Sequence, residues 1–248
     1  MSTPNITTKQ VTLPSGNGDM QMYVAMPTKA ERAPALIVLQ EAFGVNSHIR
    51  SICERLAREG YVAAAPELFH RSGKGLEFNY DEFPKIRPIF SSLTNEHLTA
   101  DVAATFAWLN HSPQVDPERI GAIGYCMGGF AATLASITTP IKTAVSYYGG
   151  GLVEARPGMA MRPLITEFSK IRAPMLFVFG DQDHGIPQTQ VEAIRHELTR
   201  LKKVHEIIVY QGADHGFFCD ERPSYHASAA AMAWERTLAW LKTHLTVS

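Results

Sequence analysis

A glycine-rich hexapeptide near the middle of the chain constrains its fold more than any other segment. Residues 124–129 read Gly-Tyr-Cys-Met-Gly-Gly, after a short apolar stretch at 119–123 and before a helix-forming stretch at 130–135. Glycines on both sides of a central residue permit a turn so sharp that larger side chains would collide with the neighbouring strand and helix. The segment therefore predicts a strand, a nucleophile elbow and a helix, with Cys126 presented at the turn.

Apolar stretches alternate with helical patterns along most of the chain. Strands are expected at 20–26, 35–40, 61–66, 142–148, 173–180 and 205–210, and helices at 47–59 and 95–110. This alternation predicts an α/β fold with a doubly wound, mostly parallel sheet and helices on both faces, in a single domain over residues 1–248. The strand at 20–26 is expected to be an antiparallel edge strand. Two segments rich in glycine, proline and charge, 68–92 and 149–169, are expected to wall a substrate pocket.

An acid and a histidine follow Cys126 in the order that this kind of elbow requires. The buried strand at 173–180 ends in a loop that carries Asp181 and Asp183, and the strand at 205–210 is followed by His215. Sites form beyond the carboxyl ends of parallel strands, so these side chains face the same way as Cys126. By position alone either aspartate can be the acid, and the other is then a loop carboxylate or a helix cap. His215 is the predicted base.

Nucleophilic acyl transfer is the chemistry that this arrangement favours. A Gly-x-Cys-x-Gly segment read alone also fits a tight turn around a buried thiol, and the acid and base downstream decide between the two interpretations. His215 would take the thiol proton from Cys126 and later deliver it to the leaving oxygen. The backbone N–H groups of Met127 and Ala42 are the expected oxyanion hole.

Four segments together resemble the dienelactone hydrolase (carboxymethylenebutenolidase) family of α/β-hydrolases. They are Gln-Glu-Ala-Phe-Gly-Val-Asn at 40–46, the elbow at 124–129, Gly-Asp-Gln-Asp-His at 180–184 and Ala-Asp-His-Gly-Phe at 213–217. Residues 225–237 also resemble the family's last helix. The resemblance implies the α/β-hydrolase fold and hydrolysis of a small ester or lactone through a covalent thioester, with no cofactor and no metal.

The resemblance also assigns roles to individual residues. It implies a triad of Cys126, His215 and Asp183, and so selects Asp183 over Asp181. It further implies that Glu41 is a carboxylate near the resting thiol, which holds Cys126 out of the attacking position until substrate binds.

The sequence departs from the family at one position. Cys219 stands four residues after the histidine, where the well-known dienelactone hydrolases carry an arginine that holds the substrate carboxylate. Arg71, Arg87 and Arg222 are the candidates to replace it. Dienelactone-like substrates therefore compete with a second interpretation, a general carboxylesterase or promiscuous hydrolase of other activated esters. The alternative outside the hydrolases is a thiol redox protein that uses Cys126.

Composition excludes several other classes of function. The chain has 23 Lys and Arg residues and 24 Asp and Glu residues, so its net charge is −1. It therefore lacks the excess of positive charge that binding to nucleic acid or to an anionic membrane surface requires. The three cysteines show no metal-ligand spacing. The first nine residues lack an apolar secretory core, and no apolar run approaches the ~20 residues of a membrane span. A small-molecule partner and a cytoplasmic location are expected.

Overall fold

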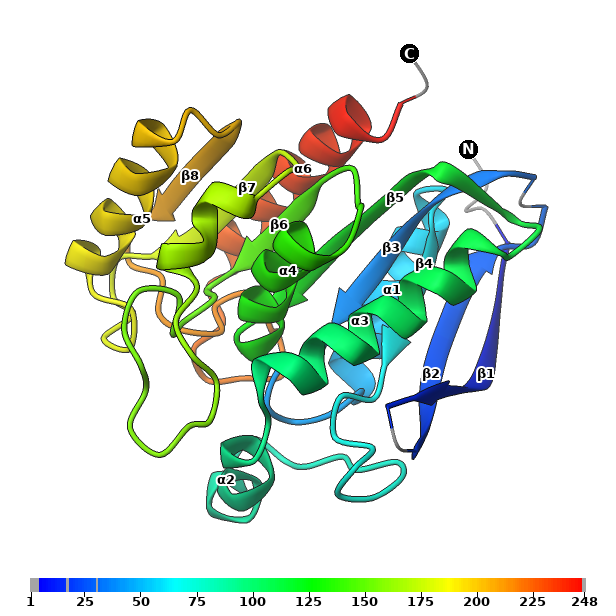
Figure 1. The fold of residues 1–248 in the computed structure, drawn as a ribbon, viewed down its shortest axis with the longest axis horizontal. Coiled ribbons are helices and arrows are strands. Elements are labelled where there is room, and N and C mark those ends of the chain that lie inside the picture. Colours follow the sequence, from blue (N-terminus) through cyan, green and yellow to red (C-terminus); the bar gives the residue numbers. More distant parts are fainter. Residues whose placement is uncertain (1–4, 17, 30, 247–248) are drawn as a thin grey trace.

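One eight-stranded sheet organises the protein. The computed structural model describes residues 5–16, 18–29 and 31–246, so residues 1–4, part of the segment expected to lack a secretory core, lie outside the described residues. The strands follow the spatial order β1-β2-β4-β3-β5-β6-β7-β8 (Figure 1). Their bounds are β1 Ile6–Ser15, β2 Gly18–Pro27, β3 Ala33–Leu39, β4 Val62–Pro66, β5 Val115–Tyr125, β6 Ala144–Tyr147, β7 Met175–Gly180 and β8 His205–Tyr210.

Helices cover both faces of this sheet. The helical bounds are α1 Ser47–Arg58, α2 Phe83–Ser91, α3 Asn95–Asn110, α4 Met127–Thr138, α5 Gln188–Arg200 and α6 Ala227–His244, with a 3₁₀ helix η1 at Ile165–Lys170. In Figure 1, α3 and α4 lie in front of the strands and α1 and α6 lie behind them. The predicted doubly wound, mostly parallel architecture is confirmed, because every neighbouring pair from β4 to β8 runs parallel.

The antiparallel edge differs from the sequence prediction. β2 contains the segment 20–26, but it pairs antiparallel with both β1 and β4, so the expectation that it forms the edge is wrong. The edge strand is β1, which pairs with β2 from Ile6 opposite Pro27 to Ser15 opposite Gly18. Six of the ten side chains of β1 are exposed, and five of these six are threonine, lysine or glutamine. An edge strand with few buried positions lacks the apolar run that signals a strand in sequence.

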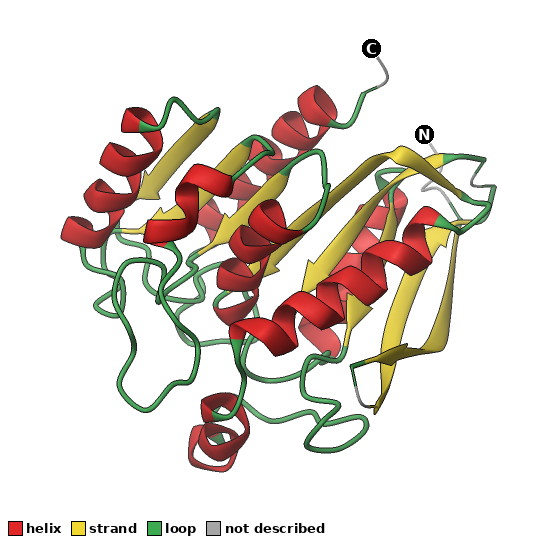
Figure 2. Ribbon diagram, viewed as in Figure 1, coloured by secondary structure: helices red, strands yellow, loops and turns green. Residues whose placement is uncertain are grey.

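The buried central strands bring their carboxyl ends to one edge of the sheet. All positions of β6 and β7 are buried, as is the second half of β5. The loops that follow these strands, together with α2, gather at the lower edge in Figure 2. The site described next lies at this edge. Within residues 5–16, 18–29 and 31–246, no helix is long and apolar enough to cross a membrane.

Candidate active site

The elbow between β5 and α4 holds Cys126 in a strained backbone conformation. Cys126 has a φ of +56°, a region that non-glycine residues rarely adopt. A Cβ added at Gly124 would lie 1.8 Å from the Gly128 carbonyl oxygen, and one added at Gly128 would lie 2.0 Å from the Leu39 carbonyl oxygen. These glycines are required because α4 begins directly against β3 and β5. The result is a cysteine fixed at the carboxyl edge of the sheet.

Asp183 and His215 lie together at the same edge. His215 Nδ1 donates to Asp183 Oδ2 at 2.7 Å, and the Asp183 side chain is 1% exposed. The other carboxylate oxygen, Oδ1, accepts from Gly185 N at 2.9 Å. The ring of Tyr148 packs against the imidazole, with centroids 5.1 Å apart. Both carboxylate oxygens are therefore occupied, and the imidazole orientation is fixed from two sides.

The imidazole interacts with the thiol of Cys126. Burial raises the pKa of Cys126, but the charge of His215 and hydrogen bonding to it outweigh burial, so the net effect lowers the thiol pKa below its ordinary value. Burial lowers the pKa of His215, and the thiol and Asp183 reverse that effect and raise it. Both shifts favour a thiolate beside an imidazolium. The structure thus brings together Cys126, His215 and Asp183, which lie far apart in sequence.

Asp181 has a different role in the same loop. Its Oδ1 accepts from Gly212 N at 2.7 Å, which ties the loop after β7 to the loop after β8. Asp181 is exposed, whereas Asp183 is buried. Of the two aspartates, only Asp183 is hydrogen-bonded to His215, in agreement with the family resemblance.

The two expected oxyanion donors lie on the loop after β3 and at the start of α4. Met127 is the first residue of α4, where backbone N–H groups have no acceptor within the helix. Ala42 follows β3, and both residues are 2% exposed. Gln40 fixes the β3 loop, because its Nε2 donates to the Glu41 carbonyl at 3.3 Å and its Oε1 accepts from Leu68 N at 3.0 Å.

Glu41 is a buried carboxylate whose nearest cation is Arg222. Glu41 Oε1 lies 3.5 Å from Arg222 Nη1, and among the described residues neither carboxylate oxygen has a hydrogen-bond partner. The guanidinium of Arg222 lies 5.6 Å from the ring centroid of Phe43 and 5.8 Å from that of Tyr80. The charge of Glu41 opposes ionisation of Cys126 and raises its pKa. Glu41 thus influences the thiol by charge, without the hydrogen bond that a direct contact would give.

The other two predicted arginines have different surroundings. Arg71 donates to both carboxylate oxygens of Asp101, at 2.8 and 2.9 Å, in a cluster that also contains Ser15 and His70. This cluster joins the β1–β2 hairpin to α3, so Arg71 is used structurally and is not brought to the thiol. Arg87 is exposed on α2. Arg222 is the member of the three that lies beside Glu41.

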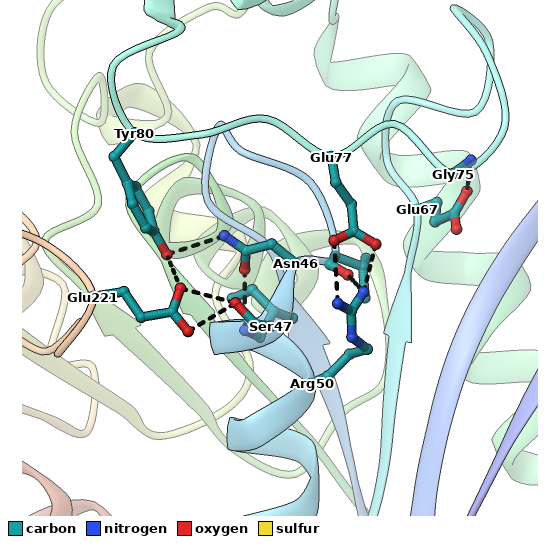
Figure 3. A network of polar contacts seen from close by, with 10 residues as sticks. Asn46, Ser47, Arg50, Glu67, Gly75, Glu77, Tyr80 and Glu221 are labelled. Atoms are coloured by element: carbon teal, nitrogen blue, oxygen red, sulfur yellow. Dashed lines mark hydrogen bonds and ion pairs between the residues drawn. The ribbon is translucent and has the colours of Figure 1, made fainter.

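Cys219 belongs to a polar network that joins three segments. Its thiol donates to the Tyr80 hydroxyl at 3.2 Å, and that hydroxyl accepts from Asn46 Nδ2 at 3.0 Å and donates to Glu221 Oε2 at 3.2 Å. Figure 3 shows Glu221 also bound to Ser47 at the start of α1. The network fastens the first insertion to α1 and to the loop that follows His215. Burial raises the pKa of Cys219 to about 12.

Sequence reasoning did not single out Tyr80, which is the hydrogen-bond partner of Cys219, or Arg156, whose charge lowers the pKa of Cys126. Both insertions do reach the nucleophile elbow, since Phe90 of the first and Met159 and Met161 of the second line a small hollow with Met127. The sequence signal that could have pointed to Tyr80 and Arg156 was that one is aromatic, the other is charged, and both lie in segments expected to line the substrate pocket. Among residues 5–16, 18–29 and 31–246, no cluster of three or more His, Cys, Asp or Glu side chains is arranged to hold a metal ion.

Comparison with known proteins identifies the family. The sequence profile of the dienelactone hydrolase family matches residues 20–245. The chain belongs to the dienelactone hydrolase family. A Synechocystis protein provisionally named carboxymethylenebutenolidase is 40% identical over 245 residues, covering 98% of this chain and 99% of the relative. An Escherichia coli K12 protein with the same provisional name is 37% identical, covering 94% and 85%.

Solved structures agree with this family assignment. A Klebsiella pneumoniae protein provisionally named dienelactone hydrolase has a TM-score of 0.88 and 35% identity, covering 96% of this chain and 99% of that one. A dienelactone hydrolase-like promiscuous phosphotriesterase from metagenomic libraries has a TM-score of 0.81 at 23% identity, covering 97% and 99%, and shows the shared fold. The predicted α/β-hydrolase fold and membership of a hydrolase family are therefore confirmed.

Proposed function

We propose that this dienelactone hydrolase family member cleaves a small ester or lactone with Cys126 as nucleophile, His215 as base and acid, and Asp183 as the group that orients the imidazole. The observation that carries the proposal is the 2.7 Å bond from His215 to the buried Asp183, beside an elbow cysteine whose pKa the imidazole lowers. A cysteine at its ordinary pKa is mostly protonated at neutral pH, so a nearby cation is what makes it a nucleophile.

The reaction follows from the positions of these groups. The Cys126 sulfur attacks the substrate carbonyl carbon, and the thiol proton resides on His215 Nε2. When the tetrahedral adduct collapses, the carbon–oxygen bond to the leaving group breaks and His215 protonates the departing oxygen. The remaining thioester is attacked by water, which gives its proton to His215. Collapse of the second adduct releases the acid and returns the thiolate. Asp183 keeps the Nδ1 proton in place throughout.

The backbone amides of Ala42 and Met127 are proposed to hold the oxyanion of each tetrahedral adduct. Their support is the buried position of Met127 in the first turn of α4 and the bracing of the β3 loop by Gln40. Each such donor typically contributes roughly 3 kcal/mol to the stabilisation of the transition state. Substitution of Gln40 is a way to disturb this geometry without touching the thiol.

Glu41 is proposed to restrain the thiol before substrate binds. A buried carboxylate near Cys126 disfavours a second negative charge, so it opposes thiolate formation and the oxidation that follows from it. Arg222 pairs with this carboxylate at 3.5 Å. A change in the Glu41–Arg222 pair on substrate binding would then alter the reactivity of Cys126.

Ester or lactone substrates are favoured by the family and by named relatives. One Bradyrhizobium relative, 31% identical and covering 92% of both chains, is named a probable 2-oxo-3-(5-oxofuran-2-ylidene)propanoate lactonase. Because Cys219 replaces an arginine of the well-known family members, broader carboxylesterase activity is the second candidate within the hydrolases. A redox role is disfavoured, since burial raises the pKa values of both Cys53 and Cys219 and leaves Cys126 without a reactive thiol partner.

Hydrolysis of p-nitrophenyl acetate tests the proposal. Purified protein should release p-nitrophenol, and Cys126→Ala should abolish release while the circular dichroism spectrum and melting temperature stay near those of the wild type. Cys53→Ala is the matched control, because its thiol is buried in α1 and should be dispensable for turnover. Equal losses in both variants, or turnover that survives complete alkylation of Cys126 by iodoacetamide, would contradict the assignment of the nucleophile.

A further inference from the structure

We infer that the free edge of β8 binds β8 of a second copy of this chain, so that two eight-stranded sheets join into one across a two-fold axis. β8 is the last strand of the sheet, and in the described part of the chain its one strand partner is β7 (Figure 1). β6 and β7 separate this edge from the nucleophile elbow at the end of β5, so the inference goes beyond the proposed function and does not depend on it.

Every second residue of β8 leaves its backbone groups free for another strand. The carbonyl oxygen of Val204 accepts from Met175 N at 3.0 Å, and that of Tyr210 accepts from Asp181 N at 3.1 Å. Because the residues that bond to the neighbouring strand alternate along a parallel ladder, the even-numbered positions of β8 face β7. The backbone groups that point out of the sheet are therefore those of His205, Ile207 and Val209. Such a row of unpaired groups is a template for another strand.

Two charged side chains of this segment are bound within the chain. Charged residues, above all lysine, keep many edge strands from pairing with other chains, and β1 at the opposite edge carries the exposed Lys9. At β8, Lys203 Nζ donates to the carbonyl oxygens of Ser169 and Ile171, at 2.6 and 2.7 Å. Lys203 is thus held toward the segment that leads into β7. Glu206, the carboxylate of β8, is bound by a guanidinium of α6.

Apolar side chains lie along the same edge. Val204, which directly precedes β8, is 62% exposed, and Met232 of α6 is 51% exposed. Met232 precedes Arg236 by one turn of α6, and Arg236 is the residue that binds Glu206, so Met232 lies on the side of α6 that faces β8. Large apolar side chains exposed together beside unpaired backbone groups are typical of a protein interface.

A two-fold axis at Ile207 gives the register with the most backbone pairs. Ile207 then lies opposite its own copy and His205 lies opposite Val209, so all three outward-facing positions exchange hydrogen bonds. A shift by two residues in either direction leaves an outer position without a strand residue opposite it. The same register sets the exposed Val204 against Tyr210 of the second copy, and an aromatic residue opposite a β-branched one is a favourable cross-strand pair.

The charges of the two copies are compatible in this register. Glu206 lies opposite Ile208, which makes the two copies of Glu206 diagonal neighbours about 7–8 Å apart. Arg236 Nε donates to Glu206 Oε1 at 2.7 Å within each copy. Each carboxylate therefore meets its twin with a guanidinium already bound, and like charge does not oppose the pairing. The edge is complementary to a copy of itself in backbone groups, apolar side chains and charge.

Charge substitution at Ile207 tests the pairing and its register. Sedimentation equilibrium should find the wild type at twice the chain mass of 27.4 kDa. Ile207→Lys sets two like charges directly opposite each other and should weaken dimerisation on the order of a hundredfold, as should Ile207→Glu. Because Ile207 lies opposite its own copy, an equimolar mixture of the two variants should dimerise again. Thr12→Lys, at the β1 edge, is the matched control and should dimerise like the wild type.

Ile207→Pro tests the pairing without adding charge. The N–H that proline lacks is one that points outward, so the hydrogen bonds to β7 remain and the fold should persist in circular dichroism. The dimer should weaken, because the central pair of backbone hydrogen bonds is lost.

Each other outcome overturns the inference. A wild-type protein that stays monomeric across the micromolar range has no such interface. A dimer as stable in Ile207→Lys and Ile207→Pro as in the wild type forms through another surface. Lysine and glutamate variants that stay monomeric when mixed exclude the two-fold axis at Ile207. Species that keep growing with concentration indicate that β8 pairs with β1 of the next copy. All of these readouts are independent of ester hydrolysis.

Discussion

Replacement of Asp183 by asparagine gives the sharpest test of the proposed triad, because the structure dictates how the new amide would be oriented. Oδ1 of Asp183 accepts from Gly185 N at 2.9 Å, and Oδ2 accepts from His215 Nδ1 at 2.7 Å. An asparagine keeps its oxygen on the Gly185 N–H and so turns its NH₂ group toward the imidazole. His215 must then accept at Nδ1 and carry its proton on Nε2, where it can no longer take the proton of Cys126.

The expected loss of turnover follows from this tautomer change. In serine enzymes the corresponding substitution lowers kcat about 10⁴-fold, which is about 5 kcal/mol of transition-state stabilisation. The thiol enzyme should lose on the order of 10⁴-fold at most, because a thiol that ionises in advance depends less on proton transfer during attack. Removal of the carboxylate also lowers the pKa of His215, so the pKa of Cys126 should rise and its alkylation curve should move to higher pH.

Asp181→Asn is the matched control for this experiment. Its Oδ1 accepts from Gly212 N at 2.7 Å, and an asparagine oxygen accepts the same bond. Turnover of p-nitrophenyl acetate and the pH dependence of iodoacetamide alkylation should therefore stay near wild type. The reasoning fails if Asp183→Asn retains turnover within tenfold of wild type, or if Asp181→Asn is the more damaging substitution.

Three further predictions address the surroundings of the site. In the absence of substrate, Glu41→Gln should lower the pKa of Cys126 and speed its reaction with iodoacetamide and hydrogen peroxide, because the substitution removes a negative charge that raises this pKa. An unchanged reaction rate would mean that Glu41 has only a structural role. Gly128→Ala should lower the free energy of unfolding by about 3 kcal/mol and the Tm by roughly 6–12 °C, because the new Cβ would lie 2.0 Å from a backbone oxygen. Gly18→Ala is the control: the nearest atom to its Cβ would be 3.8 Å away, so calorimetry should find a Tm near that of the wild type. Arg71→Gln should lower Tm but leave KM unchanged for both anionic and neutral esters, and a change in KM for anionic esters alone would return Arg71 to the substrate site. Because the pKa of Asp101 is lowered in the folded state, the difference in stability between the wild type and Arg71→Gln should be complete above about pH 4 and should disappear as the pH falls through that lowered pKa.

Much of the architecture was predictable because local sequence patterns encode it. Continuous apolar runs are typical of parallel strands buried on both faces, and such a run predicted β7 closely. β8, which is half-buried at the end of the sheet, has the bounds predicted for it. The elbow was predictable because glycine is the residue that such close backbone approaches require, and the distances at Gly124 and Gly128 agree with that reasoning. β1 was missed because its side chains are mostly solvated and show no apolar run.

The sequence by itself determined the fold class, the elbow, and the chain order of Cys126, an acid and His215, because each depends on neighbouring residues or on strand order. Only the tertiary structure decided the partners of the charged side chains. Asp181 and Asp183 stand two positions apart, yet one fastens a loop and the other orients the imidazole. Arginines in the two insertions differ in the same way, because a long, flexible side chain takes its partner from whatever the fold brings within reach, and sequence spacing carries no record of that contact.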